Sequence, residues 1–266
     1  MELSKELFST LEKYLRPNTF PVAIKIAQKD LDMPKYRSPL ASFGGSRLSV
    51  CQAIGLARRW GWLIHYTEED HICPGSFMFF GHTSVPEDVT EGRRFHYPAY
   101  AASEEIGKEI QKHMHSVEKD SIHSLYIAPL EKADFIPDVV LMYGNAAQVV
   151  RLIQATVYSD GGAVSSQFIG RGACGSSIIV PYQTGECNVI IPGSGERLFA
   201  ILEDNELLFS IPNEKFQSVI DGLKETHKRT PSRIPTPFMG MTQQPYFPQP
   251  YMDAAEGFDK EFPKKP

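Results

Sequence analysis

Four cysteines are the residues of this chain best suited to chemistry, and three of them stand close to glycine or proline. Cys73 lies in Asp-His-Ile-Cys-Pro-Gly, Cys174 in Gly-Arg-Gly-Ala-Cys-Gly, and Cys187 just after a Gly-Glu pair. A cysteine used only as a small core hydrophobe falls more often inside a periodic apolar run. Turns leave sulfur accessible, so the pattern indicates chemistry at sulfur without naming the reaction.

The fourth cysteine, Cys51, stands at the start of a predicted helix. Ser49 followed by Gln52 is a capping-box signature, which makes Ser49 the N-cap and places Cys51 in the first turn. The unpaired amides and the dipole at a helix start favour a thiolate, so we expect a lowered pKa for Cys51. The alternative is a small residue packed beneath the first turn.

His71 stands two residues before Cys73. A His-x-Cys pair can supply two ligands to zinc or iron, or it can be a thiol with a neighbouring base. The Pro-Gly that follows Cys73 favours a tight turn, and a purely structural turn is the alternative.

Arg171 and Gly172 precede Cys174 in a glycine-rich loop. Glycine permits close approach of a ligand to the backbone, and arginine binds anions. Because the loop lacks the Gly-Lys-Ser/Thr ending of a phosphate loop, it does not predict a nucleotide site. Arg197 follows two glycines and could bind the same carboxylate or phosphate as Arg171, with a surface hairpin turn as the alternative. Cys187 lies in a polar turn and is interpreted as a bystander.

The composition is that of an ordinary soluble globular protein. The chain has 266 residues, 42% of them hydrophobic and 22% charged, and a formal net charge of −5, which gives no general attraction to nucleic acid. It has no apolar run of about 18–20 residues and no apolar signal core at its start. We therefore expect a cytoplasmic protein with neither a membrane nor a nucleic acid as partner, whose cysteines are free thiols or ligands.

Short strands alternate with capped helices along the chain. Hydrophobic periodicity predicts helices over 4–14, 49–60, 146–158 and after Ser103 and Asn213, and strands over 20–26, 62–66, 76–80, 124–129, 138–143, 177–180 and 188–191, with a hairpin over 198–211. This alternation predicts one α+β domain over residues 1–228, with a mixed β-sheet and helices packed against it.

The two halves of that domain repeat the same order of elements. Each has a strand, a capped helix, a glycine turn, and then a cysteine followed by an apolar segment, after Cys73 in one half and Cys174 in the other. A degenerate duplication would make these cysteines symmetry mates facing one cleft. Chance recurrence of helix caps is the alternative.

Residues 229–266 differ in character, with eight of the 20 prolines and six aromatic residues. Proline blocks regular structure, so we predict an extended strap or tail without helices or strands. As a strap, it would bury its aromatic residues on its own domain or on a neighbouring subunit. In the second case the protein would be a homo-oligomer.

The order of these motifs resembles that of the uncharacterised ArCR family, a prokaryotic family of unknown function. The resemblance covers about residues 20–223 and is carried by Cys-Gln-Ala at 51–53, the segment 69–75, Gly-Gly at 161–162, the loop 170–174 and Gly-Glu-Arg at 195–197. Members of the family often have a Cys-Pro pair like Cys73-Pro74, and many carry a cysteine just before the Gly-x-Arg. This chain has Gly193 and Ser194 there, so the resemblance implies a fold unit and a candidate site but no four-cysteine set and no reaction.

The leading functional hypothesis is a metal centre, either an iron–sulfur cluster or zinc, because thiolates suit both. Its ligands would be Cys51, Cys73 and Cys174, with His71 or Cys187 as a fourth. We expect the three cysteines to converge in one cleft.

Two other hypotheses stay open, and with them the question whether the protein is an enzyme. One is a thiol enzyme, with a cysteine nucleophile, His71 as base, and Arg171 and Arg197 holding an anionic substrate. The other is a non-catalytic module that binds a small anionic molecule at the loop containing Arg171, which is expected at the rim of the cleft.

Overall fold

The fold is built on a single six-stranded sheet with helices on both faces. The computed structural model describes residues 1–230, 233–234 and 249–255. The strand order is β2-β3-β1-β4-β6-β5. The strands are β1 (Val22–Ala27), β2 (Ile64–Thr67), β3 (Ser124–Pro129), β4 (Val139–Gly144), β5 (Asn188–Ile190) and β6 (Leu207–Pro212). The predicted α+β class is confirmed.

Every named strand pairs antiparallel to its neighbours, where the sequence predicted a mixed sheet. The central strands β1, β3 and β4 are buried almost throughout, because both faces of the sheet are covered. Alternation along each strand divides the core in two: Val139 and Leu141 of β4 belong to one side, and Val140 and Met142 to the other.

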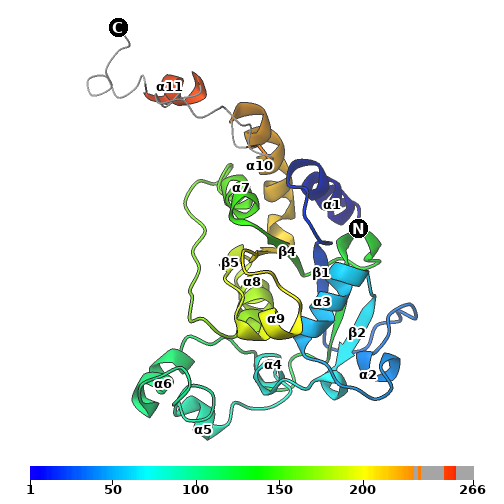
Figure 1. Ribbon diagram of the computed structural model, residues 1–266. Helices are drawn as coiled ribbons and strands as arrows, with labels where there is room; N and C mark the ends of the chain where they lie inside the picture. The colour runs from blue at the N-terminus through cyan, green and yellow to red at the C-terminus, as the bar shows by residue number, and fades with distance from the viewer. Residues whose placement is uncertain (231–232, 235–248, 256–266) are drawn as a thin grey trace.

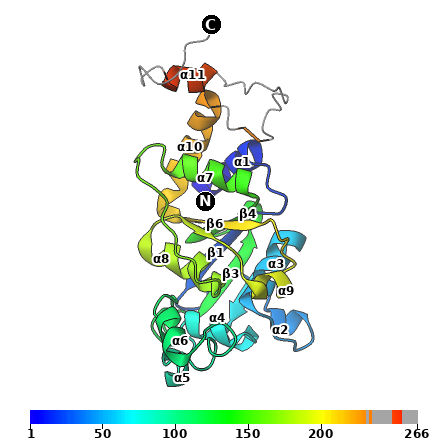
Figure 2. The same ribbon diagram turned by 60° about the vertical axis from the view of Figure 1, so that its left-hand side comes forward.

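Three long helices cover one face, as Figures 1 and 2 show. They are α1 (Glu2–Tyr14), α7 (Ala146–Thr156) and α10 (Phe216–Arg229). Their apolar sides fill the core with Leu7, Leu11, Leu152, Val219 and Leu223, all fully buried. At about 25 cal/mol per Å² of apolar surface, this burial is the main force that holds the layer on the sheet.

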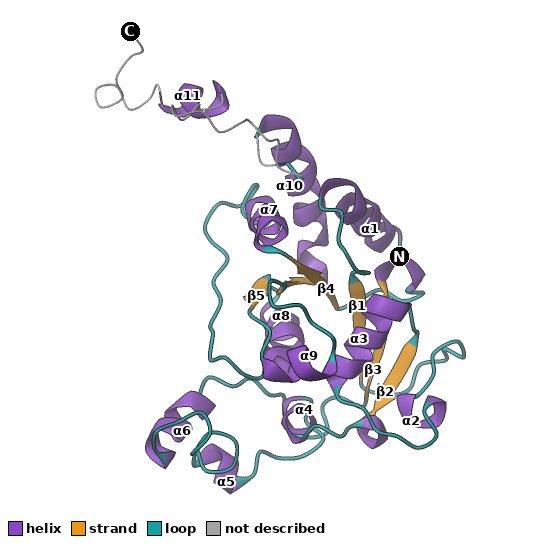
Figure 3. Cartoon of the chain, viewed as in Figure 1, coloured by secondary structure: helices purple, strands orange, loops and turns teal. Residues whose placement is uncertain are grey.

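Helix α3 (Val50–Trp60) and several short helical segments cover the opposite face, which is the face of the candidate site (Figure 3). The short segments are α4 (Pro74–Phe79), the π-helical η3 (Gly175–Ile179), α8 (Val180–Thr184) and α9 (Ser194–Phe199). The remaining elements are α2 (Pro39–Ser42), η1 (Glu68–Asp70), α5 (Glu87–Thr90), α6 (Glu104–Gln111), η2 (Leu130–Lys132), η4 (Asn213–Lys215) and α11 (Gln249–Ala255).

The predicted helix caps are present. The side chain of Ser49 accepts from the amide of Gln52, whose own side chain accepts from the Ser49 amide, and Asn145 and Gln148 form the same box at α7. Gly61 ends α3 at φ 74°, a left-handed conformation that costs glycine little. Each cap stabilises its helix by about 1 kcal/mol.

Three predicted strands are wrong, and all three lie on the site face. Residues 76–80 belong largely to α4, 177–180 to η3 and α8, and 198–202 overlap α9, so the hairpin does not form. Proline at the first or second position starts α4 and α8, where the missing amide costs nothing. Runs of four or five apolar residues do not distinguish a strand from a short helix by their periodicity.

The predicted duplication stays a prediction. The strand and capped helix of each half are present as β1 and α3, and as β4 and α7. However, α3 packs on the core of the site face, whereas α7 packs on the opposite core.

Most of the predicted strap lies outside the described residues. Within the described part, α11 is a helix where no regular structure was expected, and Pro250 occupies its first turn, where proline is tolerated. Tyr251 is 57% exposed, while Ile234 packs against the core under α1 and α10. The division at residue 228 and the homo-oligomer stay predictions.

Among the helices that the structure describes, none combines the length and the apolar character needed to cross a membrane.

Candidate functional site

Cys51, Cys73 and Cys174 line one cavity of about 230 Å³ on the site face of the sheet. Each stands at the beginning of a helical segment: Cys51 in the first turn of α3, Cys73 at the N-cap of α4, and Cys174 at the N-cap of η3. Three segments that are far apart in sequence therefore bring their thiols to the same space.

Backbone hydrogen bonds hold the segments of Cys51 and Cys73 side by side. The amide of Leu48 donates to the carbonyl of Asp70 at 2.9 Å, and the amide of Ile72 donates to the carbonyl of Leu48 at 3.1 Å. The fully buried Asp70 carboxylate accepts from the amide of Leu40, and the amide and hydroxyl of Thr67. Asp70 thus fixes the loop before Cys73 and has a structural role.

Cys174 is placed through β5. The side-chain amide of Asn188 on that strand donates to the carbonyl of Ser176 at 2.8 Å, which ties η3 to the edge of the sheet. Gly172, at φ 65°, lies against Phe79 and Met114, and a Cβ there would come within 3.0 Å of the Met114 Cε atom. Glycine is needed at position 172 for both its backbone angle and this contact.

Burial keeps the thiols of Cys51 and Cys174 protonated at neutral pH. It raises the pKa of Cys51 to about 11, and the charges of Glu196 and Cys73 add to the rise, while Ser49 Oγ, 3.0 Å from Cys51 Sγ, opposes it. Desolvation therefore outweighs the lowering that its helix start was expected to cause. Burial also raises the pKa of Cys174 well above its usual value, and Cys51 and Cys73 raise it further.

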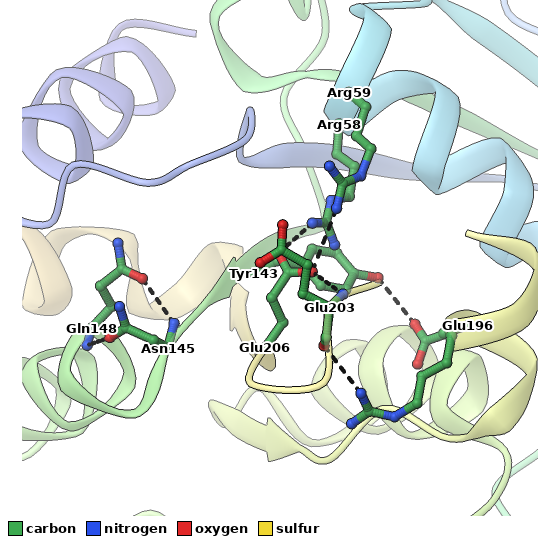
Figure 4. Close-up of polar contacts among 9 residues, drawn as sticks. Arg58, Arg59, Tyr143, Asn145, Gln148, Glu196, Glu203 and Glu206 are labelled. Atoms are coloured by element: carbon green, nitrogen blue, oxygen red, sulfur yellow. Dashed lines mark hydrogen bonds and ion pairs between the residues drawn. The ribbon is translucent and has the colours of Figure 1, made fainter. Parts of the chain in front are cut away.

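Glu196 of α9 also lines the cavity, and sequence reasoning missed it. It is only 4% exposed, and the hydroxyl of Tyr143 donates to its Oε1 at 3.0 Å, as Figure 4 shows. Its Oε2 atom is buried without a hydrogen-bond partner. Burial raises the pKa of Glu196 to about 7, although Tyr143 and the charges of Arg58 and Arg197 lower it.

A helical reading of residues 194–199 would have found this carboxyl. Helical spacing puts Glu196 on the same side as Ala200, which is buried, and turns the neighbouring Arg197 outward. The sequence instead predicts a turn followed by a strand for this segment, and that prediction favours Arg197 as the site residue.

A buried ion pair packs against Tyr143, the hydrogen-bond partner of Glu196. The guanidinium of Arg58, whose side chain is fully buried, pairs with the Glu206 carboxylate and lies 4.1 Å from the centre of the Tyr143 ring. Arg59 approaches the same carboxylate at 3.7 Å. Tyr143 is thus held between Arg58 and Glu196, which fixes the direction of its hydroxyl (Figure 4).

His71 is buried beside the Cys73 segment but does not line the cavity. Its Nδ1 atom is 3.2 Å from Ser76 Oγ, which itself donates to the carbonyl of Cys73, so His71 carries its proton on Nδ1. Burial, followed by the charge of His82, lowers the pKa of His71 to about 3. The structure therefore gives a neutral imidazole that supports the backbone around Cys73 and is not brought to the thiols.

The remaining predicted site residues divide between cavity and surface. Arg171 and Gly172 line the cavity. Arg197 does not: it donates to the carbonyl of Glu203 and to the carboxylate of Asp204 at the surface. Cys187 belongs to the core of the opposite face, where the hydroxyl of Thr156 donates to its sulfur at 3.7 Å, so it is separated from the other three cysteines by the sheet.

No group of three or more histidine, cysteine, aspartate and glutamate side chains within the described ranges is arranged to hold a single metal ion. The rest of the cavity wall is mostly apolar and is formed by Met78, Phe79, Phe95, Tyr100 and Met114.

Comparison with known proteins agrees with the resemblance noted above. The model of the family described as Uncharacterised ArCR matches residues 10–222. An uncharacterized protein of Methanocaldococcus jannaschii is 25% identical over 205 residues, which cover 76% of this chain and 86% of that protein. No solved structure matches the chain significantly.

Proposed function

We propose that this chain, which belongs to the Uncharacterised ArCR family, binds an iron–sulfur cluster through Cys51, Cys73 and Cys174. The observation that carries the proposal is the meeting of three thiols from three distant segments at one cavity. Packing of the hydrophobic core does not require free thiols from distant segments to lie together. The fourth cysteine, Cys187, packs in the core on the other face of the sheet.

The lack of a ligand set for a single metal ion among the described residues favours a cluster over one zinc ion. Zinc requires its ligands at about 2.0–2.3 Å in a closed tetrahedron, and such a group is absent from the described residues. In a [4Fe–4S] cluster each cysteine binds a different iron, so the sulfurs stand further apart than around a single ion. The lining thiols and the mainly apolar wall are consistent with a site of this kind.

Electrostatics supports a cation in this cavity. Burial raises the pKa of Cys51, Cys174 and Glu196; the charge of Cys73 raises the pKa of Cys51 further, and the charges of Cys51 and Cys73 raise that of Cys174 further. A bound metal centre would lower these pKa values instead, because a coordinating thiol is deprotonated outright and the positive charge of the metal neutralises the thiolate. Metal uptake would accordingly release protons.

Glu196 supplies a candidate fourth donor. Its Oε2 atom is buried, without a protein partner, on a carboxyl that borders the cavity. An unpaired buried polar atom costs about 1–3 kcal/mol, and a bound iron would satisfy it.

A thiol nucleophile activated by His71 has less support. His71 does not reach the cavity, and burial keeps Cys51 in its unreactive protonated form.

The test is purification of the full chain without oxygen, then measurement of iron, sulfide and zinc per chain and of the visible absorption spectrum. We expect iron and sulfide in the wild type, before or after treatment with ferrous iron and sulfide. Cys51→Ser, Cys73→Ser and Cys174→Ser should each lose most of them, while Cys187→Ser retains them as the matched control. Stoichiometric zinc without iron, or unchanged iron in the three cavity variants, would overturn the cluster.

A further inference from the structure

Arg171 brings a positive charge to the cavity without bringing an acid to balance it. Its Nη1 atom donates to His96 Nδ1 at 2.8 Å, and its guanidinium lies 4.2 Å from the centre of the Tyr100 ring. In the described part of the chain Arg171 has no carboxylate partner, whereas Arg58 pairs with Glu206 and Arg197 with Asp204.

Neutral groups hold this guanidinium in place. His96 is fully buried, and its Nε2 atom is 2.8 Å from Gln111 Oε1. Because the amide oxygen can only accept, Nε2 carries the proton and Nδ1 accepts from Arg171. Burial lowers the pKa of His96, and the charge of Arg171 lowers it too, so the ring stays neutral. The chain Gln111–His96–Arg171 orients the arginine without neutralising it.

We propose that the Arg171 end of the cavity binds the carboxylate of a small organic acid with a flat apolar body. This site goes beyond the proposed cluster and does not depend on it. The remaining N–H groups of the guanidinium fork match a planar carboxylate, which they can hold with two parallel hydrogen bonds.

The composition of the wall narrows the ligand class. Of the described residues that line the cavity, Arg171 is the single lysine or arginine, and Glu196 borders the same space. A polyphosphate or dicarboxylate would therefore have an unbalanced charge, while a monocarboxylate would not. Phe79, Phe95, Tyr100, Met78 and Met114 give the ligand's body aromatic and thioether contacts.

The size of the cavity sets an upper limit. About 230 Å³ is below the roughly 300–1,000 Å³ of pockets that enclose drug-sized ligands. The ligand expected is the size of one aromatic or aliphatic ring with its carboxylate.

The test uses benzoate as probe, titrated into the full chain by calorimetry. Benzamide serves as the uncharged isostere, and inorganic phosphate as an anion without an apolar body. We expect saturable benzoate binding in the wild type and binding at least about tenfold weaker for benzamide and for phosphate, since hydrogen bonds to a charged group account for roughly 10- to 100-fold in affinity.

Variants then locate the site. Arg171→Gln should weaken benzoate binding about 10- to 100-fold and Arg171→Lys less, because lysine keeps the charge but not the fork. Arg197→Gln removes a surface arginine that does not line the cavity, and this variant should bind benzoate as the wild type does. The melting temperatures of all three variants show whether a loss of benzoate binding is due to unfolding. If Arg171→Gln does not fold, the affinity of Arg171→Lys for benzoate decides the test.

Absence of saturable benzoate binding in the wild type would overturn the inference, as would equal binding by Arg171→Gln in a folded state. Repeating the titration on metal-free protein separates the two proposals. Benzoate binding without any iron uptake would remove the cluster and retain the acid site, and iron uptake without benzoate binding would do the reverse.

Discussion

The hydroxyl of Tyr143 and the Oε1 atom of Glu196 lie 3.0 Å apart, and they connect the central sheet to the cavity. Tyr143 stands on β4, at the middle of the sheet, and Glu196 stands in the first turn of α9. This one hydrogen bond satisfies one carboxyl oxygen and leaves Oε2 without a protein partner. The position of the acid in the site is therefore set by a residue that does not line the cavity.

Glu196→Gln should change the pH dependence of stability in metal-free protein. The folded pKa of about 7 lies above the ordinary 4.5, so the folded state holds a proton that the unfolded state releases, and stability falls as pH rises from about 4.5 through 7. The variant removes this loss. The free energy of unfolding of the variant minus that of the wild type should therefore be about 3 kcal/mol larger at pH 8 than at pH 4. Urea unfolding at both pH values measures it.

Glu203→Gln, on the exposed turn after α9, is the matched control and should follow the wild type at both pH values. Parallel curves for Glu196→Gln and the wild type would show that Glu196 is not held protonated by burial.

Arg58→Met should destabilise the protein by about 3 kcal/mol, because it leaves the buried Glu206 carboxylate with the more distant Arg59 as its remaining ion-pair partner. Urea unfolding gives the value. The double variant Arg58→Met with Glu206→Gln removes the unpaired charge and should recover most of the loss. Arg59→Met, at the neighbouring position, should cost about 1 kcal/mol or less. Equal losses of stability in Arg58→Met and Arg59→Met would contradict the claim that Arg58 is the main ion-pair partner of Glu206.

His71→Phe should leave iron binding intact while changing stability in acid. The folded pKa of about 3 lies below the ordinary 6.5, so the contribution of the neutral ring is present above pH 6.5 and is lost as pH falls toward 3. The wild type should lose up to about 4 kcal/mol over that range from this residue, and the variant should not. Urea unfolding at pH 7 and pH 4 tests the change in stability, and iron content tests whether iron binding is retained.

Gly222→Ala should separate α10 from α7. A Cβ at position 222 would lie 2.1 Å from the carbonyl oxygen of Ala155, which is backbone and cannot move aside. Overpacking of this kind costs about 1–3 kcal/mol, seen as a lower melting temperature. Gly195→Ala is the control, because a Cβ there meets nothing within 4 Å. A similar melting temperature for both variants would show that the two helices can shift apart freely.

The sequence predicts the long elements well and the short ones poorly. The caps at Ser49 and Asn145 begin α3 and α7 because their side chains bond to amides three residues on, a purely local event. The errors at 76–80, 177–180 and 198–202 concern runs of about five residues, whose conformation is decided by what they pack against. Two of these runs overlap the helices that begin beside Cys73 and Cys174.

The cavity itself illustrates the same limit. Local signals single out Cys73, Cys174 and Arg171, whose turns contain glycine or proline, and Cys51, which follows a capping-box serine. The neutral groups that orient Arg171, His96 and Gln111, by contrast, lie 75 and 60 residues away in the sequence and carry no local mark. Glu196 was missed because its helix was missed.

The order of strands in the sheet determines when the cavity can exist during biosynthesis. Cys51 and Cys73 precede β3, whereas Cys174 is tied to β5, which joins the sheet only through β6. When β3 has just emerged from the ribosome, the nascent chain contains two of the three thiols but lacks the strands that place the third. Any cofactor bound by all three thiols can therefore be inserted only after β6 has docked on the sheet.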